Sequence, residues 1–150
     1  TSDWSPLEIG SNWNTTEGAK VIIEDSGNIV IDGGVGTATT TVDFKNTKEF
    51  QFDVKIQGIG QSTLTFGDFA FDISTHGKNL TGGLQSHPIS TNLIDQNEWC
   101  TIRVKTDPGF TIYLNEFPIL SSNDPMIFHG NNVLVKHRDC KVELKRLLIR

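Results

Sequence analysis

The stretch from residue 98 to residue 115 constrains the fold more than any other part of the sequence. Apolar and polar side chains alternate over 98–105, and the alternation resumes over 110–115. Between the two runs lies Asp107-Pro108-Gly109, whose residues are typical of a turn. Because successive side chains of a strand point to opposite faces, the two runs predict a β-hairpin with one apolar face. A hairpin of this kind favours a β-sandwich.

Other short segments repeat this period of two along the whole chain. The clearest is 48–56, in which Phe50, Phe52 and Val54 share one side. No segment shows helical periodicity, and turn residues separate the runs. The sequence therefore predicts an all-β fold, either two stacked antiparallel sheets in a jelly-roll sandwich or a closed barrel. Further strands are expected at 7–9, 20–24, 28–32, 37–44, 61–66, 69–73, 117–120, 126–128, 132–137 and 141–149, with surface loops over 74–97 apart from a short strand at 83–86.

Length and charge narrow the class of protein. A chain of 150 residues fits a single domain, 1–150, which can bury roughly 70% of its unfolded surface. The net charge of −5 lacks the basic field that phosphate backbones require, so nucleic acid is not an expected partner. No apolar run approaches the roughly 20 residues of a membrane span. The start at Thr1, without a signal segment, is expected of a processed secreted protein or an excised domain.

The two cysteines leave two alternatives open. Cys100 is in phase with apolar neighbours on its predicted strand, and Cys140 is in phase with those on the last strand, so both are expected in the core. They are either buried free thiols or a disulfide, which would imply an oxidising compartment. Glycosylation sequons at Asn14 and Asn79 favour a secreted or extracellular location.

The last third of the chain resembles a known family. Asn97-Glu98-Trp99, then 101–104, then Ile112-Tyr113-Leu114-Asn115 are similar to strand signatures of concanavalin A-like lectin and glucanase domains, including laminin-G-type and glucanase-like modules. Segments 133–137 and 142–149 are similar to the closing strands of those domains. Galectins are a second resemblance, but 72–79 lacks their His-x-Asn-x-Arg motif, so galactose specificity is not implied. The resemblance implies a jelly-roll sandwich and leaves the function open.

A sugar site needs an aromatic platform that stacks on the ring and polar groups that contact the hydroxyls. Trp99 and Tyr113 point away from the core phase of their strands, so either could be that platform. Alternatively, Trp99 is a packing residue of the scaffold and Tyr113 an ordinary half-buried strand residue. Trp4 and Trp13 could be loop platforms or covers of a core edge. The polar residues expected on the same outward face are Arg103, Asn115, Gln51 and Asp53.

Catalytic and metal sites have weaker support. Glu49 and Asp53 would share a solvated face about 13 Å apart, beyond the roughly 9.5 Å that glycoside hydrolysis allows. The four histidines lack close metal-ligand spacing, and we expect them to be solvated. We expect no cofactor other than calcium, which loop aspartates of lectin-like domains sometimes bind. The loop aspartates here lack an Asp-x-Asp-x-Asp run, so a role in turns suits them better than a calcium site. These aspartates are Asp68, Asp72, Asp95, Asp107 and Asp124.

The sequence thus favours a non-catalytic, lectin-like carbohydrate-binding module in a secreted or cell-surface setting, with a glycan or glycoprotein as partner. The alternative is a module that binds another protein or assembles into oligomers. A glycan hydrolase is the third reading.

Overall fold

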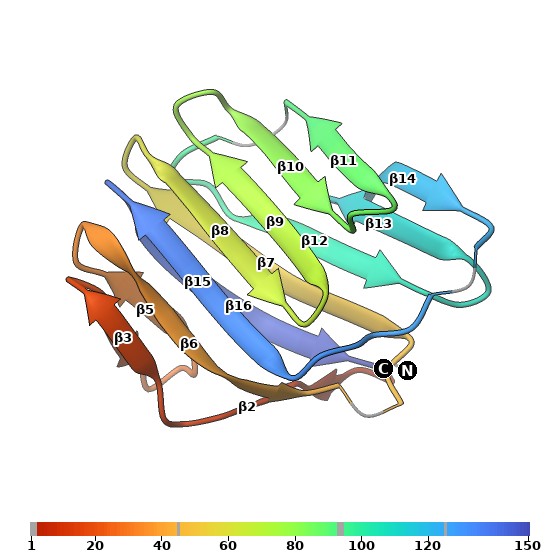
Figure 1. The fold of residues 1–150 in the computed structure, drawn as a ribbon, viewed down its shortest axis with the longest axis horizontal. Coiled ribbons are helices and arrows are strands. Elements are labelled where there is room, and N and C mark those ends of the chain that lie inside the picture. Colours follow the sequence, from red (N-terminus) through yellow and green to blue (C-terminus); the bar gives the residue numbers. More distant parts are fainter. Residues whose placement is uncertain (1–2, 45, 93–94, 125) are drawn as a thin grey trace.

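The computed structural model describes residues 3–44, 46–92, 95–124 and 126–150. These residues form two eight-stranded antiparallel sheets that stack face to face (Figure 1). The described part contains no helix, and therefore none long and apolar enough to cross a membrane. The prediction of an all-β, two-sheet sandwich is confirmed.

We name the two layers by their position in Figure 1, where the front sheet faces the viewer. The back sheet has the order β14 (Phe117–Ser122), β13 (Phe110–Leu114), β12 (Cys100–Lys105), β7 (Glu49–Gln57), β16 (Lys141–Ile149), β5 (Ile29–Asp32) and β4 (Lys20–Ile23), and β1 (Ser5–Pro6) pairs with β16. The front sheet has the order β11 (Pro88–Thr91), β10 (Asn79–Gly83), β9 (Phe69–Ser74), β8 (Gln61–Phe66), β15 (Asn132–Arg138), β6 (Val35–Asp43) and β2 (Glu8–Ile9), and β3 (Asn14–Glu17) pairs with β6.

The core lies between the inner faces of the two sheets. The predicted hairpin is β12–β13, in which Ile102 faces Leu114 and Val104 faces Ile112, all four fully buried. Phenylalanine rings cross the layer from both sheets, with the ring of Phe52 4.9 Å from that of Phe66 on the opposite sheet. Because inward side chains alternate with outward ones, each sheet keeps a polar outer face.

Several strand predictions were wrong, and the two-residue strand β1 was not predicted. The segment 74–97, predicted as loops apart from a short strand at 83–86, contains β10 and β11. In β10, Gly82 has φ +111° and a Cβ there would lie 2.3 Å from the carbonyl oxygen of Ala70, so the close approach of β9 requires glycine and hides the alternation. The strand β3 is wholly exposed and has no apolar side to detect. Residues 126–128 are not a strand, and 84–86 lie in the connection between β10 and β11.

Both cysteines are buried, as their phases predicted, with 5% of each residue exposed. They are free thiols in the structure, so of the two alternatives it contains the buried thiols and not the disulfide. The Sγ atom of Cys140 donates to the carbonyl oxygen of Gln61 over 3.4 Å. Burial raises the pKa of both thiols above the ordinary value.

Candidate functional site

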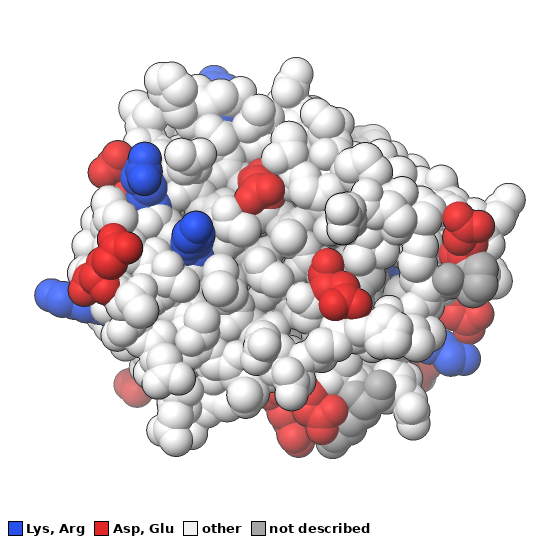
Figure 2. Space-filling model, in the orientation of Figure 1, with Lys and Arg blue, Asp and Glu red and all other residues white. Residues whose placement is uncertain are grey.

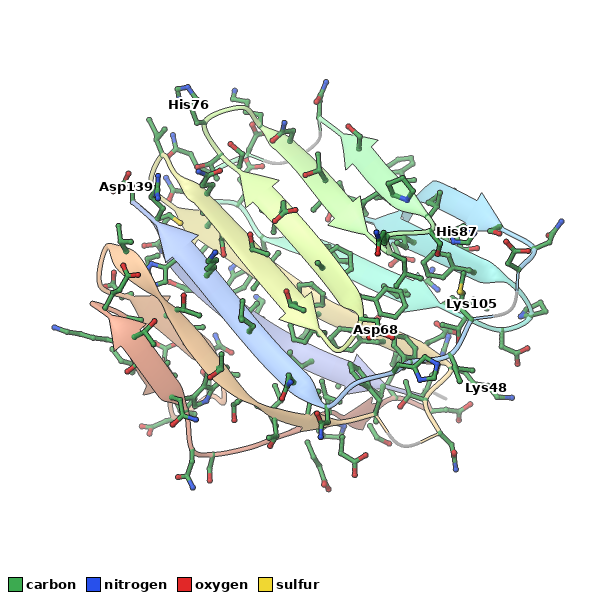
Figure 3. The ribbon with its side chains drawn as sticks, in the orientation of Figure 1. Lys48, Asp68, His76, His87, Lys105 and Asp139 are labelled. Atoms are coloured by element: carbon green, nitrogen blue, oxygen red, sulfur yellow. The ribbon has the colours of Figure 1, made fainter. Side chains whose placement is uncertain are left out.

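A groove of about 730 Å³ crosses the outer face of the front sheet. It lies where β15 and β9 end and where β6, β8 and β10 begin. Asp139 and His76, in the turns after β15 and β9, lie at this end of the sheet, whereas Asp68 lies at the opposite end (Figure 3). Figure 2 looks onto this face and shows charged side chains scattered sparsely over it.

The strand register builds the groove from two adjacent rows of residues, all of them polar except Val35. In the first row, Thr37, Lys136, Thr63, Asp72 and Thr81 lie opposite one another across β6, β15, β8, β9 and β10. On β6, β8, β9 and β15 these positions alternate with buried ones, so their side chains point outward. The second row is Val35, Arg138, Gln61, Ser74 and Asn79.

Few of these polar side chains form hydrogen bonds with other side chains or with the backbone of the described residues. Thr63 Oγ1 donates to Asp72 Oδ1 over 2.6 Å, which leaves Oδ2 of the same exposed carboxylate for another donor. Ser74 Oγ accepts from the backbone N–H of Gly77 over 3.1 Å. The groove is therefore able to exchange hydrogen bonds with a polar ligand. No Trp, Tyr or Phe is among the described residues that line it.

The carboxylates of the groove are far apart. Asp72 on β9 and Glu17 on β3 are its two described acidic residues, and four strand spacings separate them. At about 4.8 Å per spacing this is about 19 Å along the sheet. Glycoside hydrolysis needs two carboxyl groups at most about 9.5 Å apart. The pair therefore has the wrong separation for that chemistry.

One histidine at the groove departs from the prediction that histidines are solvated. His137 is only 3% exposed, because its strand phase with Val133 and Val135 turns it inward. Its Nδ1 lies 3.2 Å from the carbonyl oxygen of Gly34, and Nε2 has no partner among the described residues. His87 is also partly buried, with Nε2 3.2 Å from Asp124. The prediction holds for the two exposed histidines, His76 and His129.

Three of the predicted sugar-binding residues form one row on the outer face of the back sheet. Arg103 lies opposite Gln51 on β7 and opposite Tyr113 on β13. Its guanidinium lies 3.8 Å over the ring of Tyr113 and 3.2 Å from Glu49 Oε2. One face of the Tyr113 ring is thus covered by a cation of the same chain.

The next row holds two further predicted residues, and both already accept hydrogen bonds from the protein. Asp53 is 3% exposed and accepts from Thr101 Oγ1 and from Arg146 Nε, each over 2.7 Å. The bond to Asp53 raises the pKa of Arg146. Asn115 Oδ1 accepts from the backbone N–H of Thr101 over 2.9 Å.

The prediction that Glu49 and Asp53 lie on a solvated face is wrong. Glu49 is 8% exposed and lies within 3.2 Å of both Arg103 and Arg150. Long arginine side chains cover both carboxylates, since they pair with them and bury their stems on the sheet.

The predicted tryptophans are also partly covered. Trp99 is half-buried beneath Lys145 and Lys55, whose ammonium nitrogens lie 3.9 and 4.9 Å from its ring centre. Arg150 lies 4.3 Å from the ring of Trp4. Trp13 lines a second, smaller cavity of about 430 Å³ beside β4. For Trp99, the alternatives were a sugar platform and a packing residue of the scaffold. In the structure Trp99 packs against side chains of the same chain.

The loop aspartates considered for calcium do not come together. Three of them pair separately: Asp107 with Lys48, Asp95 with Lys78 and Asp124 with His87. The described part of the chain holds no group of three His, Cys, Asp or Glu side chains placed to bind a metal. Of the two sequon residues, Asn14 is exposed and Asn79 lines the groove.

The sequence contained a signal for the groove residues, but we did not interpret it as a binding site. Thr63 and Thr65 alternate with other residues on β8, and Thr37 and Thr39 flank Ala38 on β6, which indicates outward hydroxyls at these four positions. Searching for an aromatic platform directed attention to the back sheet instead. Which alternating strands lie side by side depends on pairings between residues up to 103 positions apart.

Solved structures with the same architecture are numerous. The carbohydrate binding module CBM66 from Bacillus subtilis has a TM-score of 0.61 at 14% identity, over 90% of this chain and 92% of that one. The carbohydrate recognition domain of Emp46p in its metal-free form has a TM-score of 0.64 at 11% identity, over 93% and 88%. The Bacillus licheniformis β-glucanase has a TM-score of 0.61 at 8% identity, over 97% and 98%.

The protein has a concanavalin A-like jelly-roll fold. The resemblance seen in the last third of the sequence is thereby confirmed for the architecture of the chain. No protein-family model matches the sequence, and a search of curated protein sequences finds no match either. Because concanavalin A-like folds carry several activities, the function has to be argued from the groove.

Proposed function

We propose that this protein is a non-catalytic carbohydrate-binding module that holds a saccharide in the groove of the front sheet. The observation that carries the proposal is the open double row of hydroxyl, amide and charged side chains on that face. The likeness to a carbohydrate binding module and to a carbohydrate recognition domain supports it.

Because no aromatic side chain is among the described residues that line the groove, polar side chains would recognise the saccharide through hydrogen bonds. Each sugar hydroxyl both donates and accepts, so it suits a carboxylate beside an amide. The free oxygen of Asp72 accepts, while Asn79 and Gln61 can do both. Hydrogen bonds to the charged carboxylate are roughly twice as strong as those between neutral groups.

The separation of about 19 Å between Asp72 and Glu17 supports binding without hydrolysis. The two acids on the back sheet are closer along the chain, but arginines neutralise both of them. A secreted or cell-surface setting belongs to the same proposal, and the exposed sequon at Asn14 supports it.

A glycan array probed with the bacterially expressed protein tests the proposal and avoids a glycan on Asn79. We expect binding to at least one oligosaccharide, and a loss of tenfold or more in Asn79→Ala and Asp72→Ala. Both residues are at the surface, so circular dichroism should be unchanged. Trp99→Ala and Tyr113→Ala serve as controls on the back sheet and should retain affinity. Silence across the array, or binding lost only in the two controls, would contradict the proposal, and turnover of a bound oligosaccharide would contradict its non-catalytic part.

A second candidate function is assembly with another copy of the same chain. The strand β4 ends the back sheet, and Ile22 and Ile23 are each 54% exposed on it. An unpaired edge strand is a template for strand addition. Antiparallel pairing about Ile22 would place Lys20 opposite Glu24 of the partner subunit, so the edge is complementary to itself in charge.

Sedimentation velocity over a range of concentrations tests this second candidate. We expect a dimer, weakened by Lys20→Glu and restored when Glu24→Lys is added. A monomer at every concentration, or no recovery in the double variant, would rule this edge out.

A further inference from the structure

Two cations lie side by side in the groove without a partner. Lys136 and Arg138 line it from β15, and neither makes an ion pair, hydrogen bond or ring contact through its side chain with any described residue. Most other described cations contact an acid or an aromatic ring, although the net charge of −5 leaves an excess of anions. Those with such a contact are Lys48, Lys55, Lys78, Arg103, Lys141, Lys145, Arg146 and Arg150.

The fold itself keeps these two side chains unpaired. They are two residues apart on one strand, so they share a face about 7 Å apart. The residues opposite Lys136 are Thr37 and Thr63, and those opposite Arg138 are Val35 and Gln61, all of them neutral.

Carboxylates near the groove lie further off. Asp72 and Glu17 are each two strands away from β15, about 10 Å. Asp139 follows Arg138 in the turn after β15 but forms no ion pair with it. Since exposed charges are largely screened beyond about 8 Å at physiological ionic strength, Asp72 and Glu17 would repel an anion over β15 only weakly.

We propose that the groove selects acidic saccharides, whose carboxylate or sulfate group is held over β15 by Lys136 and Arg138. This inference rests on the proposed carbohydrate-binding function and names its ligand class. The guanidinium matches a planar carboxylate or a sulfate with two parallel hydrogen bonds, and the ammonium adds a second positive charge. Asp72 and Asn79, about 10 and 14 Å along the sheet from β15, would then contact hydroxyls of neighbouring sugar units.

The test compares oligosaccharides that differ only in their charged group. The probes are trigalacturonate and its methyl ester for a carboxylate, sialyllactose and its methyl ester for a second carboxylate, and sulfated and unsulfated lactose for a sulfate. All are placed on one array, and the best pair is measured by titration calorimetry. We expect the acidic member of at least one pair to bind tenfold or more tightly than its neutral partner, and added salt to weaken only the acidic member.

Charge-removing variants assign that preference to residues. The double variant Lys136→Met/Arg138→Met should reduce the acidic preference to less than twofold, because it weakens binding of the acidic member at least fivefold more than binding of the neutral one. Lys105→Met, an unpaired cation on the back sheet, is the matched control and should keep the preference. Equal binding of acidic and neutral members, or a preference that survives in the double variant, overturns this inference alone. Failure of every probe to bind, while another glycan of the array is bound, also overturns this inference alone, whereas silence across the whole array overturns the proposed function with it.

Discussion

The Nε atom of Arg146 lies 2.7 Å from Oδ2 of Asp53, although the two residues are 93 positions apart. A register shift in β16 between Lys145 and Leu148 makes this contact, with Arg146 at φ +51°. The register shift adds one residue to β16 relative to β7. Without this residue, strict alternation from Leu144 would turn Arg146 toward the core. The bulge turns it onto the outer face and brings the later apolar residues Leu147 and Ile149 against the core.

Arg146→Met should lower the free energy of unfolding by about 1–2 kcal/mol, because it leaves the buried carboxylate of Asp53 with fewer donors. The loss should be smaller than the 3–5 kcal/mol of a fully buried pair, since the Arg146 side chain is 59% exposed. Urea denaturation measures the difference. Lys105→Met, at a cation of β12 that has no ion pair with the described residues, is the control and should stay within about 0.5 kcal/mol of the parent protein. Equal effects of the two substitutions would contradict this role for Arg146.

Tyr113→Ala should weaken the fold by about 1–2 kcal/mol without changing saccharide affinity more than about twofold. The reason is that the ring of Tyr113 stacks on Arg103, 3.8 Å away, rather than facing a ligand. Thermal unfolding and titration calorimetry on the same samples separate the two effects. Thr111→Ala, on the same outer face of β13, is the matched control. A tenfold loss of affinity with unchanged stability would restore the back sheet as the binding face.

Phe52→Ala should cost about 3–5 kcal/mol, because it removes a fully buried ring and leaves a cavity between the sheets. Its ring contacts those of Phe50, Phe66 and Phe71. Phe117→Ala removes the same side chain at a site that is 68% exposed and should be nearly neutral. Chemical denaturation of both variants checks this. Similar losses at the two positions would mean that the assigned core is wrong.

Alkaline pH should destabilise the protein through its two thiols. Burial raises the pKa of Cys100 and Cys140 in the folded chain, so the unfolded chain releases these protons first. Their contribution to stability is complete below the unfolded pKa of about 8.5 and is lost as pH rises through the folded values. Unfolding free energies measured between pH 7 and 10 should therefore fall less steeply in the variant Cys100→Ala/Cys140→Ala. Parallel pH profiles would contradict the prediction, as would rapid reaction of both native thiols with a thiol reagent at pH 8.

The groove on the front sheet and the predicted site on the back sheet differ in how many of their charged side chains form ion pairs within the protein. Gln51, Arg103 and Tyr113 do lie in one row, as their alternation indicated, so the prediction of their common face was correct. The acids that pair with Arg103 are Glu49, 54 positions away on β7, and Glu116, 13 positions away after β13. Lys136 and Arg138 have neutral neighbours on both sides and stay available.

The order of residues alone determined the all-β class, the hairpin β12–β13 and the inward or outward direction of most side chains. It could do so because alternation is local and a strand keeps its period of two wherever it is placed. Only the tertiary structure decided which outer face is closed by ion pairs and which holds an open groove. Those outcomes depend on strand neighbours distant in the chain, and in β16 on one extra residue that reverses the facing of all that follow it.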